Sequence, residues 1–475
     1  MAKARRRLAF LLIICLCLGV LYHFTSRDCF RSTLLPTGRV QHVIIISIDA
    51  LREQDLELLA QLPNIGSLVE RGVSAPARCV YPSNTYPSHA AIATGVPPRV
   101  HGIVDNMMPQ PGKHPFPDWY WWASALKVPA IWAHVKAAGF TTAAILWPVT
   151  AGASIDYLVP EIRANDRGES LLLLAMKYGT PILVLRLVLS YGLQVALGRK
   201  PSLDDFATYG AATIFRRYRP HLLMLHLNET DFARHRYGPE APEVVVSLHQ
   251  QDRRVGEIMK AATAAGIAEK TLFVITGDHG TLSTRYVLNL NAAFKQAGLL
   301  TTDAEGHIES WRAYALHSGG TSEVYLSDPK DGDLKKQVSA LLAEIASNPN
   351  NGVIEVKTGE EAAKQYGASP EPSFYVILSP GWAAGKSLDA PMLETVKGTM
   401  GSHGYLPGTP GYRTAFIMCG PGVRPGLRLG EIRLTDEAPT IAYLLGIPMS
   451  GVEGRVLEEA LVDDISDRSS LSPSR

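Results

Sequence analysis

Short apolar runs, each long enough for one buried strand, recur along the 475-residue chain. They fall at 42–49, 141–146, 222–227, 271–276 and 414–418. Nearly continuous apolar runs are typical of strands buried on both faces, as in a parallel sheet. Helical patterns lie between them, for example at 56–71, 131–138 and 244–265. This alternation predicts an α/β fold, in which helices cover both faces of a mostly parallel central sheet.

The same patterns divide the chain into regions. Residues 41–463 are expected to form the main domain, with 287–395 as a smaller inserted lobe, and the tail at 464–475 is expected to fray. A Leu- and Val-rich stretch within 165–200 is interrupted by charged residues, Gly179 and Pro181, which argues against a second membrane span. Two interpretations of this stretch stay open, a buried helical pair and a helical lid over an active site.

The N-terminus has the pattern of a membrane-targeting segment. Basic residues at 1–7 precede an apolar run at 8–24, as in a signal peptide or an uncleaved signal-anchor. The residues that follow offer no A-x-A-like cleavage site, so we favour the anchor. The charge asymmetry would place 1–7 in the cytoplasm. The rest, beyond a linker at 25–40, would be periplasmic or extracellular, and cleavage would make it a secreted protein.

Composition excludes several classes of protein. The chain has 46 basic and 45 acidic residues, a net charge of +1, which gives no sign of a nucleic-acid binder. Its 46% hydrophobic and 19% charged residues exclude a disordered chain. Its five cysteines are scattered and contain no CxxC, which disfavours a disulfide framework and a thiolate metal site. None of this predicts an oligomeric state.

Carboxylates and histidines gather where the predicted strands end. The set is Asp49, Asp231, His235, Asp278 and His279, together with His403, which lies between glycines in GSHGY. Each one alone has an ordinary explanation, since a strand-terminal Asp is usually a turn or capping residue. The carboxyl ends of parallel strands meet at one edge of a sheet, where such folds place their ligands. Three Asp and three His would suit a two-metal zinc site, with three ligands for each ion.

Hydroxyl groups cluster at the start of a predicted helix near residues 81–95. Ser83, Thr85 and Ser88 are each placed near the helix N-terminus, where free N–H groups favour an anion. A hydroxyl touching zinc there would ionise more easily and become a nucleophile. The pattern alone does not choose among the three.

Several motifs together resemble the type I phosphodiesterase/nucleotide pyrophosphatase family of the alkaline phosphatase superfamily. They are IDALR, PSNTYPSHAAIATGVPPRVHGIVDN, WPV, YRPHLLMLHLNETDFARHRYGP, ITGDHG, GSHGY and CGPGVRPG…LTDEAPTIAYLLGIP, between about residues 43 and 457. The resemblance implies an alkaline phosphatase-like three-layer α/β/α sandwich and makes 41–463 the catalytic domain. It also implies that small phosphodiesters or nucleotides are hydrolysed through a phosphothreonine intermediate.

The resemblance also assigns roles to residues. It implies that Thr85 is the nucleophile and that Asn106 helps to hold the phosphoryl oxygen. Two Zn²⁺ ions are implied, one held by Asp231, His235 and His403, and the other by Asp49, Asp278 and His279 with Thr85 close to it. The chain departs from the family pattern at Ala50, where Gly is common, and at Thr230, where Pro is common. We expect Ala50 to be tolerated if its φ is negative.

Two other functions stay open on the same residues. A phosphomonoesterase or sulfatase could use a similar metal site. However, residues 79–84 lack the sulfatase C-x-P-x-R signature, and no Arg lies between Thr85 and Arg99. A non-catalytic anchored binding protein would have lost a ligand or the nucleophile, and neither is missing. The aromatic cluster at 119–122 could stack on a base, bind a cation or simply pack in the core.

Overall fold

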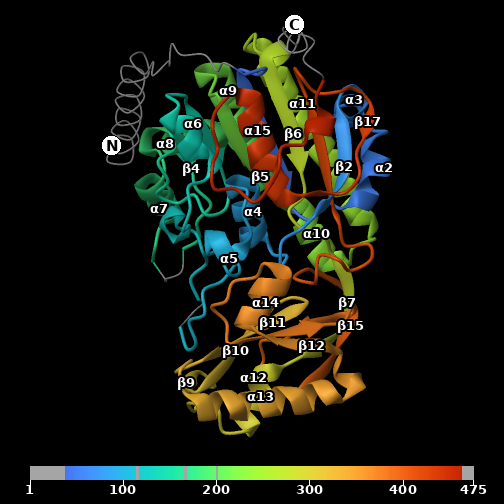
Figure 1. The fold of residues 1–475 in the computed structure, drawn as a ribbon. Helices are drawn as coiled ribbons and strands as arrows, with labels where there is room; N and C mark the ends of the chain where they lie inside the picture. The colour runs from blue at the N-terminus through green and yellow to red at the C-terminus, as the bar shows by residue number, and fades with distance from the viewer. Residues whose placement is uncertain (1–37, 114–116, 165–167, 199, 201, 463–475) are drawn as a thin grey trace, which may run out of the picture.

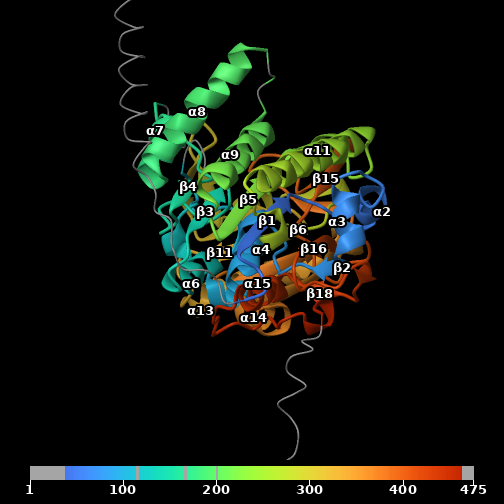
Figure 2. The same ribbon diagram turned by 90° about the horizontal axis from the view of Figure 1, so that it is seen from above.

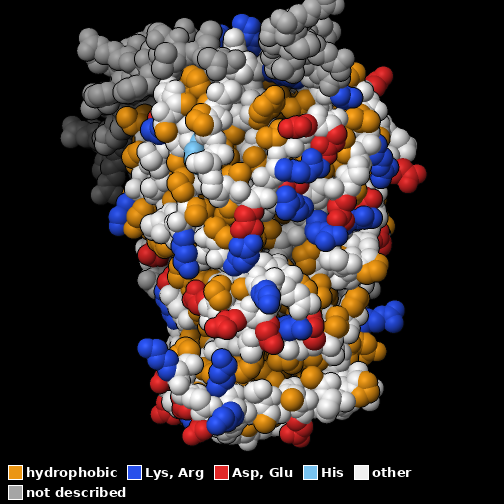
Figure 3. Space-filling view, in the orientation of Figure 1, with side chains coloured by type: hydrophobic (Ala, Val, Ile, Leu, Met, Phe, Trp, Pro, Cys, Tyr) orange, Lys and Arg blue, Asp and Glu red, His pale blue; other side chains and the backbone are white. Residues whose placement is uncertain are grey.

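The computed structural model describes residues 38–462 except 114–116, 165–167, 199 and 201 (Figure 1). The predicted basic end, the apolar run at 8–24, most of the linker and the tail lie outside the described residues. Within the described part, no helix combines the length and apolar character that a bilayer crossing requires. On the face seen in Figure 3, acidic and basic side chains are interspersed, in keeping with the net charge of +1.

A nine-stranded sheet forms the centre of the fold, in the order β17-β2-β16-β6-β1-β5-β3-β4, with β18 also paired to β2. The five predicted strands are β1 (His42–Ile48), β3 (Thr142–Ile145), β5 (Leu222–Leu227), β6 (Thr271–Thr276) and β16 (Thr414–Cys419). The others are β2 (Val73–Arg78), β4 (Tyr157–Val159), β17 (Leu427–Arg428) and β18 (Ile432–Arg433). Strand β1 pairs in parallel with β5 and β6, and β16 is antiparallel to β6 and β2. The predicted mostly parallel sheet is confirmed.

Helices cover the two faces of this sheet, as Figure 2 shows. Helices α4 (Thr85–Thr94), α6 (Ile131–Ala137) and α15 (Glu437–Leu445) share one apolar cluster with Val43 and Ile45 of β1. Helices α3 (Ile65–Arg71), α9 (Leu203–Tyr218) and α11 (Pro242–Ala264) share the other with Ile44 and Ile46. Successive residues of a strand point to opposite faces. The predicted three-layer sandwich is therefore confirmed.

The helix predicted at 56–71 is wrong in one respect, because the chain breaks it into α2 (Leu56–Leu59) and α3. Pro63 lies at the break, and a proline disfavours helical backbone at the residue before it. The side chain of Asp252, on α11, then accepts the backbone N–H groups of Asn64 and Ile65 at 3.0 and 2.7 Å. This carboxylate satisfies free donors at the start of α3.

A second group of elements lies between β7 (Leu282–Leu288) and β15 (Leu393–Ser402), below the large sheet in Figure 1. Its helices are α12 (Leu290–Gln296), α13 (Gly332–Ser347) and α14 (Gly359–Tyr366). Its strands are β8 (Leu300–Thr302), β9 (Ile308–Trp311), β10 (Ala313–Ser318), β11 (Thr321–Leu326), β12 (Val353–Thr358), β13 (Phe374–Leu378) and β14 (Trp382–Ala384). They pair as β10-β11-β13-β12, β14-β7-β15 and β8-β9. An apolar cluster of its own, including Phe294, Val338 and Phe374, fills this lobe.

The stretch at 165–200 contains α7 (Leu171–Tyr178) and α8 (Pro181–Ala196). None of the α7 residues is fully buried, so this helix does not fit the buried-pair interpretation. Helix α8 buries Leu183, Val184, Leu187 and Tyr191 but leaves Leu193 and Leu197, at its end, 62% and 79% exposed. The pair lies on the flank of the sheet beside β4 (Figure 2). The lid over the active site stays a prediction.

Candidate active site

Two groups of three side chains lie at the carboxyl edge of the central sheet. One group is Asp49, Asp278 and His279, and the other is Asp231, His235 and His403; within each group, the potential ligand atoms lie within 4.8 Å of one another. We call them the buried triad and the outer triad. Asp49 follows β1, and Asp278 and His279 follow β6, as expected where parallel strands end. The outer triad joins α10 (Glu229–Tyr237), the helix after β5, to His403, which follows β15 of the lobe.

The distances within these groups are short. The Nε2 atom of His279 lies 3.2 Å from Asp49 Oδ1 and 3.4 Å from Asp278 Oδ2. In the outer triad, His235 Nε2 lies 3.3 Å from Asp231 Oδ2. The rings of His279 and His403 stack with centroids 4.0 Å apart, so the two triads are neighbours. The structure thus brings all six predicted ligands into one place.

The electrostatics of the two triads suit bound cations. Burial, reinforced by the Asp278 and Asp231 carboxylates, raises the pKa of Asp49 well above its ordinary value. Among the described residues, one oxygen each of Asp49, Asp231 and Asp278 is buried without a hydrogen-bond donor. Burial lowers the pKa of His403, which keeps its imidazole neutral and able to donate a lone pair. Carboxylate oxygens and neutral imidazoles are the donors that Zn²⁺ accepts, so the residues fit the predicted metal.

The potential ligands are held by further hydrogen bonds. His235 Nδ1 lies 2.8 Å from the carbonyl of Gly401, and His403 Nδ1 lies 2.6 Å from Asn84 Oδ1. With a proton on Nδ1, each ring would leave Nε2 free for a metal. His226, on β5, lies 3.2 Å from the second oxygen of Asp49. Such partners fix the orientation of ligand side chains.

The condition under which we expected Ala50 to be tolerated, a negative φ, is not met, because its φ is +59°. This region is costly for a residue with a Cβ atom. The backbone N–H of Ala50 donates to Asp278 Oδ1 at 2.9 Å, and the residue is fully buried. The turn after β1 therefore keeps this conformation while it positions a carboxylate of the buried triad.

Thr230, which stands where the family commonly has Pro, is buried, and its Oγ1 lies 3.2 Å from Ser247 Oγ.

The three candidate hydroxyls lie in different surroundings. Thr85 is the first residue of α4, is 8% exposed, and places Oγ1 3.3 Å from His279 Nε2. Ser83 is fully buried and donates from Oγ to the carbonyl of Tyr405 at 2.6 Å. Ser88 is also fully buried. Of the three, Thr85 alone contacts a triad, and it is the least deeply buried.

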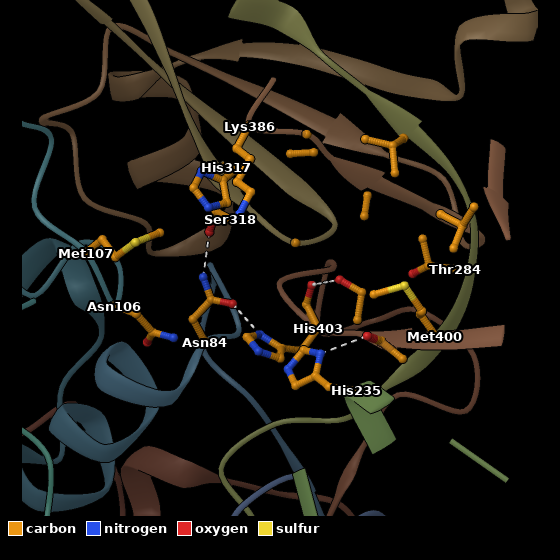
Figure 4. Close-up of a pocket in the computed structure, with 18 of the residues that line it drawn as sticks. Asn84, Asn106, Met107, His235, Thr284, His317, Ser318, Lys386, Met400 and His403 are labelled. Atoms are coloured by element: carbon orange, nitrogen blue, oxygen red, sulfur yellow. Dashed lines mark hydrogen bonds between the residues drawn. The ribbon is translucent and has the colours of Figure 1, made fainter. Parts of the chain in front are cut away.

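A cleft of about 560 Å³ opens beside the outer triad (Figure 4). Asn106 lines it and accepts the backbone N–H of Tyr86 through Oδ1 at 2.8 Å, which leaves its amide nitrogen available to other partners.

The aromatic cluster at 119–122 divides between two roles. Trp119 lines the cleft, with the Arg163 guanidinium 4.2 Å above its ring, whereas Tyr120 and Trp121 are buried. The core-packing interpretation therefore holds for only part of the cluster.

Sequence reasoning missed three residues that hold this site together. Asn84 donates to Asp105 Oδ1 at 2.6 Å and to Ser318 Oγ at 2.5 Å, besides its contact with His403. Its position directly before Thr85, at the N-cap of α4, was an available signal. His226 was hidden inside an apolar strand. Ser318 belongs to the lobe, and nothing in the local pattern connects it with a helix start more than two hundred residues earlier.

Comparisons with known proteins agree with this arrangement. The family model described as type I phosphodiesterase/nucleotide pyrophosphatase matches residues 43–406. The chain belongs to this family. It is 23% identical to an uncharacterized pyrophosphatase/phosphodiesterase of Schizosaccharomyces pombe over 88% of this chain and 82% of that protein. It is also 27% identical to human ectonucleotide pyrophosphatase/phosphodiesterase family member 1, over 50% of this chain and only 23% of the human protein.

Solved structures of the family share the fold. Mouse ectonucleotide pyrophosphatase/phosphodiesterase 5 superposes with a TM-score of 0.63 at 18% sequence identity, covering 89% of this chain and 100% of the mouse chain. The human protein of the same name gives the same values. This family member therefore has a fold of the same type as those enzymes, with a large and mostly parallel central sheet.

Proposed function

We propose that the protein hydrolyses phosphodiester or nucleotide pyrophosphate bonds with Thr85 as the nucleophile. The observation that carries this proposal is the position of Thr85 Oγ1, 3.3 Å from His279 Nε2 of the buried triad and at the N-terminus of α4. A hydroxyl at that place has cationic neighbours when metal is bound and the positive end of a helix dipole beside it. Both favour the alkoxide that attacks phosphorus.

Two zinc ions would occupy the site, one in each triad. Asp49, Asp278 and His279 would hold the ion beside Thr85, and Asp231, His235 and His403 would hold the other. Bound zinc would supply Lewis-acid stabilisation of the attacking and leaving oxygens. A mouse structure in this family is described as an inactive variant with a threonine replaced by alanine, in complex with AMP. That description supports both the threonine and a nucleotide ligand for this chain.

The protein's own residues would place the substrate. Asn106 would donate from its amide nitrogen to a phosphoryl oxygen, because Oδ1 is already engaged by Tyr86 N–H. Asn84 would keep the outer triad aligned with Thr85 through His403. Arg99 forms an ion pair with Glu453, so it is engaged elsewhere. A diester carries less charge on the transferred group than a monoester dianion, so it has less need of an arginine beside the nucleophile.

Replacing Thr85 tests the proposal. Thr85→Ala should abolish nearly all turnover of bis(p-nitrophenyl) phosphate while zinc content and the circular dichroism spectrum stay normal. Thr85→Ser should keep much of the activity, since the hydroxyl is retained. Ser83→Ala and Ser88→Ala are the matched controls, and peptide mass analysis of trapped turnover should find phosphate on Thr85. Normal rates for Thr85→Ala would refute the nucleophile assignment.

The alternative activities are distinguished by substrate. A sulfatase or phosphomonoesterase would prefer p-nitrophenyl sulfate or p-nitrophenyl phosphate to the diester, and a non-catalytic binding protein would turn over none of them. Zinc identity and number are measured by elemental analysis of the active protein. Recovery of one ion per chain, or of none, would refute the two-zinc proposal.

We also propose that residues 8–24 anchor the protein and that the hydrolase lies outside the cytoplasm. The support is the sequence pattern, a basic end ahead of an apolar run. A reporter fused after the last residue should be active in the periplasm or outside the cell and not in the cytoplasm. N-terminal sequencing of the membrane fraction should recover residues 1–7, whereas chains that begin near 25–30 would show cleavage.

A further inference from the structure

The outward side of α8 is apolar. Ile182, Leu189, Leu193 and Leu197 follow one another at helical spacing, which places them on one side of the helix. They are 48%, 49%, 62% and 79% exposed, whereas the opposite side of α8 packs into the core. A helix that is apolar all round is ordinarily buried on every side. Among the described residues nothing covers these four side chains, which we call the outer stripe.

The neighbouring helix adds to this surface. Leu171 and Leu173 of α7, which packs against α8, are 54% and 64% exposed. Figure 2 shows α8 projecting from the flank of the fold, with the end that carries Leu193 and Leu197 farthest from the central sheet. Single exposed leucines are ordinary, but a group of them on one projecting element indicates an interaction surface. We call the outer stripe with Leu171 and Leu173 the α7–α8 face.

The charges of this segment all have one sign. Residues 171–203 contain no Asp or Glu, although the whole chain has 46 basic and 45 acidic residues. Their charged residues are Lys177, Arg186, Arg199 and Lys200. Lys177 and Lys200 are exposed. Exposed leucines accompanied only by positive charges suit a bilayer with anionic lipids, because leucines enter the acyl region and lysines face the phosphates.

The bilayer is within reach of this face if residues 8–24 are the anchor proposed above. Residues 25–37 lie between that run and the first described residue, Gly38. When extended, such a segment spans at most roughly 45 Å. The catalytic domain would therefore stay close to the membrane surface, where a weak second contact forms readily.

We propose that the α7–α8 face docks on a lipid bilayer that contains anionic phospholipids. In this arrangement α8 lies in the plane of the interface, with its outer stripe among the acyl chains, and does not cross the bilayer. The proposal is independent of the hydrolase chemistry, but it rests on the proposed anchor to bring the domain to the membrane. Without lipid the same side chains face water, where they favour contact between two molecules.

A fluorescent probe on the outer stripe tests this docking in the full chain. Leu193→Cys, labelled with a polarity-sensitive fluorophore, is reconstituted into vesicles of phosphatidylcholine and phosphatidylglycerol. Cys79 and Cys419 are buried and can stay, whereas the three N-terminal cysteines are replaced by serine. The emission should shift to shorter wavelength, and nitroxide groups on the lipid acyl chains should quench it.

Matched variants separate docking from mere attachment to the vesicle. The same probe at Lys336→Cys, on an exposed position of α13 in the lobe, should report water and remain unquenched. Lys177→Glu combined with Lys200→Glu should reduce quenching at the Leu193 position, because the like charges repel anionic headgroups. Lys335→Glu combined with Lys336→Glu makes the same change of charge on α13 and should leave quenching unchanged. Vesicles of phosphatidylcholine alone should give weaker quenching than the mixed vesicles.

Each other outcome would overturn the proposal. A probe at Leu193→Cys that reports water in vesicle-bound protein would remove the docking surface and leave the anchor intact. A shifted emission without quenching by the lipid nitroxides would mean that protein covers the outer stripe, either a second copy or the apolar run at 8–24. A full chain that does not remain with the vesicles would overturn both the docking surface and the anchor, and hydrolysis of a diester by that chain would leave the proposed enzymatic function standing.

Discussion

The side chain of Asn84 lies 2.6 Å from the ring of His403, Oδ1 to Nδ1. One residue belongs to the N-cap of α4 and the other to the turn at which the chain returns from the lobe. The amide nitrogen of Asn84 donates at the same time to Asp105 and to Ser318. A single buried amide thus connects the proposed nucleophile helix, a proposed metal ligand and the lobe.

Replacing Asn84 should weaken metal binding. In Asn84→Ala, His403 loses the acceptor that fixes its tautomer and orientation, and losses of this kind cost about 10–100-fold in metal affinity. Zinc titration against a competing chelator measures the change. Asn350→Ala, at an exposed position, is the control. Unchanged zinc affinity in Asn84→Ala would mean that His403 is oriented without the amide.

Replacing Ala50 with Gly should stabilise the protein. The φ of +59° is unfavourable for Ala and readily adopted by Gly, so Ala50→Gly should raise the free energy of unfolding by up to about 1 kcal/mol. Chemical denaturation of the metal-free protein checks this. Ala144→Gly, at a buried β-strand position, should be destabilising instead. A loss of stability in Ala50→Gly would show that packing of the methyl group outweighs the backbone strain.

The buried carboxyl of Glu437 should make stability depend on pH. Burial raises its pKa from the ordinary value of 4.5 to about 8, so between these values the folded state binds more protons than the unfolded state. Stability from this group is therefore fully present below about pH 4.5 and is lost as the pH rises through about 8. Glu437→Gln keeps an acceptor for Thr276 Oγ1, which donates to Oε1 at 2.8 Å in the parent.

Thermal unfolding of Glu437→Gln and the parent protein at a series of pH values measures this dependence. The difference in Tm should move in favour of the variant as the pH rises from about 5 to about 8. Glu431→Gln, at an exposed site, should follow the parent curve. Parallel curves for Glu437→Gln and the parent would show that Glu437 ionises normally in the fold.

The exposed leucines at the end of α8 should promote self-association. Leu193 and Leu197 are 62% and 79% exposed, so replacing both with Ser should change the unfolding free energy by little, about 0.5 kcal/mol per site. The double variant should show less association in sedimentation experiments, because exposed apolar patches promote contact between molecules. Leu187, fully buried on the same helix, is the matched control, and its removal should cost about 2–5 kcal/mol. Equal sedimentation of the double variant and the parent would exclude these leucines as the contact.

The sequence predicted those parts of the fold that periodicity encodes. Strands such as 271–276 are nearly continuous apolar runs because helices cover both sides of the sheet, and this pattern is visible without a structure. The helix predicted at 56–71 failed because the pattern continued across Pro63. The carboxylate that accepts the N–H groups at the new helix start, that of Asp252, comes from a distant helix and leaves no trace in the local pattern.

The residues of the candidate site were likewise predictable only in part. Asp49 and Asp278 could be placed at one edge because strand ends in parallel sheets meet there. His403 was already in the candidate set, but its grouping with Asp231 and His235 followed from family resemblance, since it arrives on a strand of the lobe. His226 and Ser318 were missed because their partners lie far along the chain.

The lobe departs from the core just after His279 and returns just before His403, so proposed ligands stand at both of its attachment points. A metal bound by the outer triad would connect the end of β15 to α10. It would act as a removable cross-link that closes a very long loop. Cross-links of this kind limit the freedom of the open chain, and the effect grows with loop length. Removal of the metal by a chelator would then free the returning strand from α10 as well as abolish catalysis. The two segments that join the lobe to the core, next to His279 and His403, would become the first sites of proteolysis.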